Sequence, residues 1–195
     1  MEHSDNGGAI MESLNSYAPE IIRAGGQEWI QWYAAVWYTP QDPGSQYELF
    51  PGAYERIHKN AFDDVLRTSQ NIEALYNHNR HDVMGDTDSK TLFLTPDEIG
   101  LRAAVPYDAT DPVRSKARAK LTQNVVKGGS FRANFNHEPE KTDKGWILHV
   151  RHVDKLTEVS LVHKPAYTSA RADQVRERIK EEEERIRRIL RAKEL

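Results

Sequence analysis

The sequence predicts a mixed β/α fold: a small closed or nearly closed β-barrel surrounded by helices, with a charged C-terminal helix. Short segments in which apolar and polar residues alternate recur along the chain, which is the pattern of half-buried strands. Only two or three segments show the apolar spacing of a helix. Many short strands with so few helices favour a barrel whose helices pack on the outside.

A chain of 195 residues suits one domain with short appendages. We expect an N-terminal tail and helix over residues 1–28, the main domain over 29–169 and a charged helical tail over 170–195. Apolar residues at helical spacing over 9–24 predict the first helix. In the tail, charged residues surround a narrow apolar stripe, which predicts a coiled-coil-like seam that Glu182 weakens.

The first half of the main domain is expected to be mostly strands. The aromatic run 29–37 favours a strand, and 47–50 favours a second, shorter one. Residues 60–67 predict a short helix, because their apolar side chains fall on one side of it. Further strands are expected in quick succession at 72–77, 91–95 and 101–106.

The second half begins with a predicted helix. Thr110 and Asp111 precede Pro112, and a capping oxygen just before proline is a typical helix start. Gly128 is expected to end this helix, where a C-terminal glycine is common. An apolar stripe with a spacing of four residues supports the helix and consists of Val113, Ala117, Leu121 and Val125. The last strands are expected at 130–135, 146–153 and 157–162.

Composition excludes several classes of function. The chain has no cysteine, so disulfides, thiol catalysis and cysteine metal sites are excluded. A net charge of -3 gives no reason to expect nucleic-acid or membrane binding. No apolar stretch approaches the roughly 18 residues that span a bilayer. The polar N-terminus does not have the pattern of a secretion signal.

Three distant segments carry the residue types of a serine hydrolase. His78 ends an apolar run, and an imidazole titrates near neutral pH, as a general base requires. Ser130 follows two glycines, which would let a substrate approach the backbone closely. Glu158 lies in an otherwise apolar strand, where a buried carboxylate needs a partner such as a histidine. Together they supply a base, a nucleophile and an orienting group.

Each of these residues also has a purely structural interpretation. Ser130 could merely begin a strand, and His78 and Glu158 could lie on the surface. Other histidines compete for the orienting role, namely His137, His149, His152 and His163. A metal site near His78 is a further alternative, using His81, Asp82, Asp86 and Asp88, although their spacing does not match a calcium loop. We expect no metal or other cofactor.

These segments resemble the caudovirus prohead serine proteases, the maturation proteases of tailed-phage capsids. The resemblance runs from about Trp32 to Ala170. Its most specific block is Leu156 to Ala166, which resembles the family's leu-x-glu-val-ser-leu-val…pro-ala signature. The remaining blocks precede it in the chain and occur in the family's order, at 34–37, 55–63, 75–79, 84–85, 97–101 and 129–131.

The chain also departs from the family pattern after the serine. The family usually has an aromatic, a glycine and another aromatic there, whereas here Arg132 and Ala133 intervene between Phe131 and Phe135. This departure bears on how the substrate fits. It also leaves open an alternative function, a catalytically inactive capsid-assembly factor with the same barrel fold.

The resemblance implies a serine endopeptidase with His78 as the base, Ser130 as the nucleophile and Glu158 as the orienting residue. The herpesvirus capsid proteases, which the family resembles in fold, use a second histidine in the orienting role, so that role stays open. Backbone N–H groups near Gly129 and Ser130, or the side chain of Arg132, would stabilise the oxyanion.

The resemblance further implies the substrates and the location. The substrates would be the phage scaffold, the N-terminal part of the capsid protein and the protease itself. The enzyme would act inside the procapsid in the host cytoplasm, as a homo-oligomer, with no nucleic-acid or membrane partner. The tail 170–195 would bind scaffold helices and be removed later.

Overall fold

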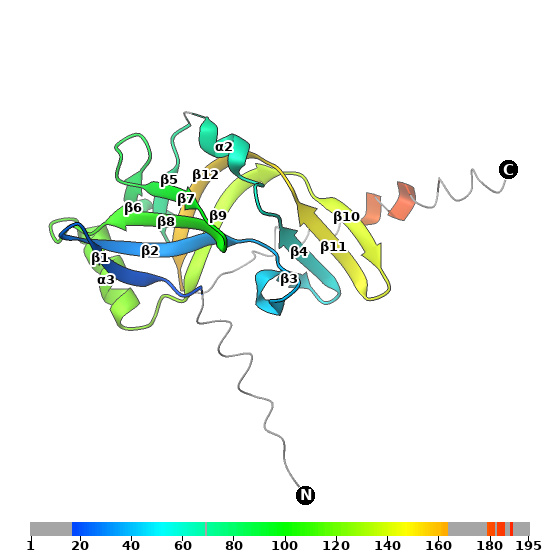
Figure 1. Cartoon of the computed structure of the whole chain (residues 1–195), viewed down its shortest axis with the longest axis horizontal. Helices are drawn as coiled ribbons and strands as arrows, with labels where there is room; N and C mark the ends of the chain where they lie inside the picture. Colours follow the sequence, from blue (N-terminus) through cyan, green and yellow to red (C-terminus); the bar gives the residue numbers. More distant parts are fainter. Residues whose placement is uncertain (1–16, 69, 164–178, 182, 186–187, 189–195) are drawn as a thin grey trace, which may run out of the picture.

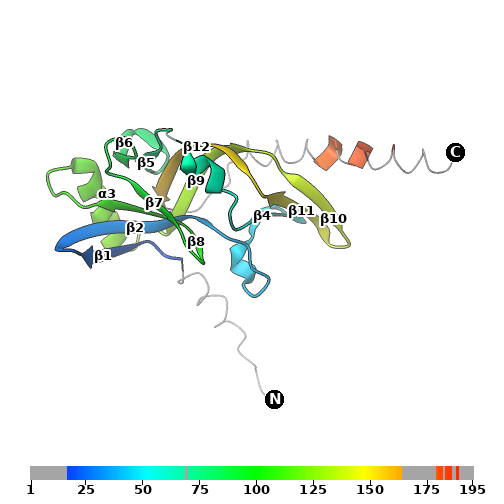
Figure 2. The ribbon, with the colours of Figure 1, turned by 45° about the horizontal axis from the view of Figure 1, so that its top comes forward.

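The computed structural model describes residues 17–68, 70–163, 179–181, 183–185 and 188. They form three four-stranded sheets, which we call A, B and C. Sheet A has the strand order β1-β2-β8-β7, sheet B has β10-β11-β4-β3, and sheet C has β6-β5-β12-β9. In both ribbon views sheet B extends to one side of the other two sheets (Figures 1 and 2).

Sheet A is antiparallel throughout. A two-residue turn joins its first two strands, with Gly25 at φ 59° and Gly26 at φ 77°, a backbone region that glycine enters without steric cost. Its strands are β1 (Glu20–Ala24), β2 (Gln27–Val36), β8 (Gly100–Pro106) and β7 (Phe93–Pro96).

Sheet C carries the three candidate residues. Its central strand β12 pairs antiparallel with β9 and parallel with β5, and β5 continues through a tight turn into β6. The strands are β6 (Asn79–Asp86), β5 (Glu73–Tyr76), β12 (Val153–Val162) and β9 (Gly128–Phe135).

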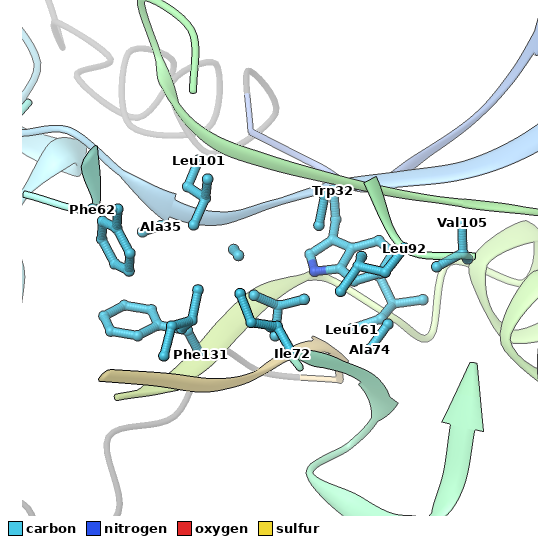
Figure 3. Close-up of a cluster of buried hydrophobic side chains, with 14 of the residues drawn as sticks. Trp32, Ala35, Phe62, Ile72, Ala74, Leu92, Leu101, Val105, Phe131 and Leu161 are labelled. Carbon is cyan, nitrogen blue, oxygen red and sulfur yellow. The ribbon is translucent and has the colours of Figure 1, made fainter. Parts of the chain in front are cut away.

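Sheets A and C enclose the main hydrophobic core. Trp32 and Leu101 come from sheet A, and Ala74 and Leu161 from sheet C, and each is almost fully buried. Figure 3 shows these side chains in the layer between the two sheets. The short helix α2 (Asp63–Arg67) follows Phe62, which joins the same core.

Sheet B has a smaller core of its own. Its strands are β10 (Glu138–Thr142), β11 (Gly145–Val150), β4 (Ala53–Ile57) and β3 (Tyr47–Phe50). Trp146 and Leu148 are buried there against Ile179, one of the helical residues of the C-terminal segment. In the same segment Glu183 pairs with Lys141 of β10 at 3.8 Å. Residues 170–178, 182, 186–187 and 189–195 of the expected tail 170–195 lie outside the described part of the chain.

The predicted closed or nearly closed barrel surrounded by helices is wrong. The three sheets are open, and the helices in the described part of the chain are few and short. Alternation marks each strand as half-buried, but it does not determine which strands close a sheet or leave it open. Here β4 and β11 pair in parallel and build a separate sheet beside the main core.

The predicted N-terminal helix over 9–24 is contradicted where the structure describes it, because Glu20–Ala24 forms β1. The apolar side chains of Ile21 and Ile22 are not on a helical stripe. They lie opposite Ile30 and Trp29 of β2. Pairing with a neighbouring strand therefore outweighs the local helical spacing.

The predicted helix start at Asp111 is confirmed, but the predicted end is not. Helix α3 (Pro112–Thr122) begins with the Asp111 carboxylate accepting hydrogen bonds from the backbone N–H groups of Val113 and Arg114. It ends six residues before Gly128, and Asn124, at φ 54°, turns the chain away. Gly128 instead opens strand β9.

Gly129 marks the point where β9 crosses β2. A Cβ atom at Gly129 would lie 2.0 Å from the Tyr33 carbonyl oxygen and 2.5 Å from Cδ1 of Trp32. Contacts this short are impossible, and the neighbours are a backbone group and a fully buried indole. The absence of a side chain therefore allows close packing against β2, whereas the sequence suggested close approach to a substrate.

Substitution of this glycine should destabilise the fold. Gly129→Ala is expected to lower the free energy of unfolding by about 3 kcal/mol, because the added methyl group overpacks a rigid crossing. Urea denaturation of the purified protein measures this loss. The matched control is Gly25→Ala, where the methyl group meets no atom within 4 Å and only the positive φ costs about 1 kcal/mol. If the two variants lost the same free energy of unfolding, the close packing of Gly129 against β2 would be contradicted.

Candidate active site

His78 occupies the tight turn between β5 and β6. Asn77 and His78 both have positive φ, 56° and 59°, which is the geometry of a type I′ hairpin turn. Non-glycine residues are uncommon in this region and are concentrated at functional sites. The sequence analysis placed His78 at the end of an apolar run, just after the strand expected at 72–77, and in the structure it is part of the turn between β5 and β6.

Hydrogen bonds tie this turn to the end of β12. The backbone N–H of Asn77 donates to the Leu161 carbonyl oxygen at 2.9 Å. The backbone N–H of His163 donates to the Asn77 side-chain oxygen at 3.0 Å. With its backbone fixed in this way, His78 directs its imidazole to β12, where Nδ1 lies 2.5 Å from Oε1 of Glu158.

Glu158 is almost fully buried, with 4% of its surface exposed, and each of its oxygens has a partner. Oε1 accepts the hydrogen bond from His78, and Oε2 accepts one from the hydroxyl of Ser160 at 2.6 Å. The Arg132 Nε lies 3.7 Å from Oε1. These partners allow a carboxylate to remain inside the sheet.

The same partners keep the carboxylate charged. Burial alone would raise the pKa of Glu158, but the hydrogen bonds from His78 and Ser160 and the nearby charge of Arg132 outweigh it. The pKa of Glu158 is therefore held below its ordinary value. Since an ionised carboxylate only accepts hydrogen bonds, Nδ1 of His78 carries a proton, and the neutral tautomer of this imidazole has its lone pair on Nε2.

Ser130 lies on the neighbouring strand, on the same face of sheet C. In the antiparallel pairing of β9 with β12, Ser130 is opposite Ser160, and Arg132 is opposite Glu158. Residues directly opposite each other share a face, with Cβ atoms about 5 Å apart. Ser130 is partly exposed, whereas Ser160 is fully buried. Of these two serines, Ser130 is therefore the one that a substrate can reach.

The competing histidines have other hydrogen-bond or ion-pair partners. His137 pairs with the fully buried Glu55 at 2.6 Å. His149 lies between His58 at 2.8 Å and Glu140 at 2.7 Å. The other two competitors, His152 and His163, are paired with Asp64 and Asp154, and with Tyr76 and Asn77, respectively.

The possible metal ligands near His78 include two β6 aspartates, Asp82 and Asp86, that make hydrogen bonds to other side chains or to the backbone instead. Asp82 accepts hydrogen bonds from Lys116 and Asn79, each at 2.9 Å, and these partners lower the pKa of Asp82. Asp86 accepts hydrogen bonds from the backbone and hydroxyl of Ser89. In the part of the chain that the structure describes, no three histidine or acidic side chains form a group that could hold a metal ion.

Sequence reasoning missed Ser160 as a member of this site. The signal was present, because Glu158 and Ser160 alternate onto one face of the same strand. Strand alternation could not show that the serine hydroxyl contacts the carboxylate, since that depends on the side-chain rotamers.

A carboxylate-bound histidine, with a partly exposed serine on the strand that pairs with the strand of the carboxylate, supplies the residue types of a serine hydrolase. Comparison of the sequence with models of known protein families identifies the family. A family model described as caudovirus prohead serine protease matches residues 15–185, and the chain belongs to this family. The family is one of hydrolases that act as serine proteases in phage capsid maturation.

A search of the curated proteins and a search of the solved structures find no match. Among the described residues, none of the helices has the length and apolar character needed to cross a membrane.

Proposed function

We propose that this chain is a serine endopeptidase in which Ser130 is the nucleophile, His78 the general base and Glu158 the orienting residue. The observation that carries the proposal is the hydrogen bond between His78 Nδ1 and Glu158 Oε1, 2.5 Å long. It supports Nε2 as the proton acceptor. The position of Ser130 on the adjacent strand, on the same face as Glu158, supports its role as the proton donor.

The reaction would proceed in two halves. Ser130 Oγ attacks the peptide carbonyl carbon while His78 Nε2 takes the hydroxyl proton, and Glu158 stabilises the resulting imidazolium. When the tetrahedral intermediate collapses, the C–N bond breaks and the amine leaves with that proton. Water, activated by His78, then hydrolyses the acyl-serine ester and restores the hydroxyl of Ser130.

The oxyanion of the tetrahedral intermediate needs hydrogen-bond donors. We propose the backbone N–H groups of Gly129 and Ser130, or the Arg132 side chain. Arg132 is mostly exposed, with its Nε 3.7 Å from Glu158 Oε1, so its positive charge lies next to the His78–Glu158 pair. This placement supports an electrostatic role for Arg132 on the face that holds Ser130.

The proposed substrates are the phage scaffold, the N-terminal part of the capsid protein and the protease itself. Membership in the prohead protease family supports them, as does the charged C-terminal segment, which would direct the enzyme to scaffold helices. The enzyme would act as a homo-oligomer inside the procapsid in the host cytoplasm.

Labelling with a serine-directed fluorophosphonate tests the proposal. The parent protein is expected to gain one phosphonyl group, and peptide mapping by mass spectrometry is expected to find it on Ser130, because only an activated serine reacts. Ser130→Ala should not be labelled. Ser115→Ala, a substitution on the surface of α3, should be labelled like the parent.

The same experiment distinguishes the alternative function. A folded parent protein that takes up no label would be a catalytically inactive assembly factor. Label on a serine other than Ser130 would retain the enzyme class but reject the proposed nucleophile.

A further inference from the structure

Ser160 lies within the candidate site without belonging to the three proposed catalytic residues. It is fully buried in the central strand of sheet C, two residues after Glu158, so both side chains are on one face. Its hydroxyl donates a hydrogen bond to Oε2 of Glu158 at 2.6 Å. Because its only proton is used in this bond and it is buried, Ser160 is unsuited to attack a substrate.

The two oxygens of Glu158 have separate partners. Oε2 faces Ser160 on the same strand, and Oε1 faces His78 in the β5–β6 turn. A carboxylate held at only one oxygen can rotate about its last torsion angle, which is broad and nearly two-fold. The Ser160 hydrogen bond removes that freedom and directs Oε1 at the imidazole.

We propose that Ser160 is a positioning residue of the site, whose hydroxyl holds the Glu158 carboxylate oriented toward His78 Nδ1. This inference rests on the proposed function of Ser130, His78 and Glu158. It assigns to the serine of the Glu-Val-Ser segment a part in catalysis without contact with the substrate.

The charged groups around Glu158 come from each strand packed against it. His78 lies in the turn after β5, Arg132 is opposite Glu158 on β9, and Glu73 is opposite it on β5. Hydrogen bonds from His78 and Ser160 counter the effect of burial. Loss of the Ser160 donor therefore favours protonation of the carboxylate and raises the pKa of Glu158.

The test is the pH profile of peptide cleavage by Ser160→Ala. We expect kcat/KM to fall about 10- to 100-fold, which is the effect of losing one hydrogen bond to a charged group. We also expect the acid limb of the profile to move to higher pH. Ser160→Cys keeps a weak donor of similar volume, so its acid limb should lie between those of the parent and Ser160→Ala. It also tests the inference if the alanine variant does not fold.

The matched control is Ser45→Ala. Ser45 is also fully buried, at the end of the 3-10 helix η1 (Pro43–Ser45), and its hydroxyl donates to the Asp42 carbonyl oxygen at 2.6 Å, far from the candidate site in the sequence. The control should lose stability while keeping the acid limb of the parent. A purely structural role of Ser160 would give the same result as this control.

The outcomes of these experiments distinguish the positioning role of Ser160 from the proposed protease function. An active parent whose acid limb is unchanged in both Ser160 variants overturns the positioning role and leaves the proposed function intact. A parent that neither cleaves peptides nor reacts with the phosphonate overturns both.

Discussion

Replacing Ser130 with alanine is expected to reduce cleavage of the scaffold and capsid proteins by about a million-fold, because removal of a nucleophile eliminates the covalent step. The candidate serine is partly exposed on β9, so the substitution removes one oxygen atom without opening a cavity in the core. Co-expression of each variant with its substrates, followed on gels over time, measures the effect. Ser130→Ala should leave full-length substrates and should fail to cleave itself.

A second variant makes this test specific. His78→Ala is expected to cause a loss of similar size, and the double variant should lose little more than either single variant, because the two residues act as a unit. Additive losses would indicate that the two side chains act independently. Equal processing by the parent and Ser130→Ala would eliminate Ser130 as the nucleophile.

Replacing Glu158 with glutamine is expected to reduce kcat about 10,000-fold. The substitution keeps the shape of the side chain but removes the charge that stabilises the imidazolium. It also allows an amide N–H to face Nδ1, which would place the histidine proton on Nε2 and block proton transfer from Ser130. Steady-state cleavage of a substrate peptide measures kcat, and the rate of phosphonate labelling should fall in parallel.

Glu55→Gln is the matched control for this variant. Glu55 is also a buried glutamate bound to a histidine, with His137 at 2.6 Å, but it lies in sheet B. It should lose stability while keeping the kcat of the parent at temperatures where it is folded. If Glu158→Gln kept the activity of the parent, another group would have to orient His78.

The lowered pKa of Glu158 also has a consequence for stability. A carboxylate whose pKa is depressed by folding stabilises the protein fully above its unfolded pKa of about 4.5, and this contribution is lost as the pH falls through the lower folded value. The parent should therefore lose more stability than Glu158→Gln on acidification below pH 4.5.

The elements predicted correctly from the sequence are those that residues within the element itself specify. The start of α3 was predicted because Asp111 and Pro112 are adjacent, and the observed cap uses that carboxylate. Strand β1 was not predicted, because it is specified by pairing of Ile21 and Ile22 with β2. The open arrangement of the sheets could not be predicted either, since it depends on contacts between strands far apart in the chain.

In the candidate site, too, features that depend on contacts between side chains or on turn geometry were not predicted from the sequence. Residue types suggested His78, Ser130 and Glu158, and the family resemblance gave them their expected roles. Of the three, His78 and Glu158 are hydrogen-bonded in the structure. The turn at Asn77 and His78 was missed because its sequence lacks the glycine that usually marks a type I′ turn. The partnership of Glu158 with Ser160 was missed because it depends on side-chain rotamers.

An experimental structure of the phosphonate-treated protein tests the central claim most directly, through the distance between His78 Nε2 and Ser130 Oγ. We expect the phosphorus atom on Ser130 Oγ, with Nε2 within about 3.2 Å of that oxygen, the reach of a general base. A separation of more than about 8 Å, with the label on another residue, would contradict the claim, because proton transfer requires direct contact or one bridging water.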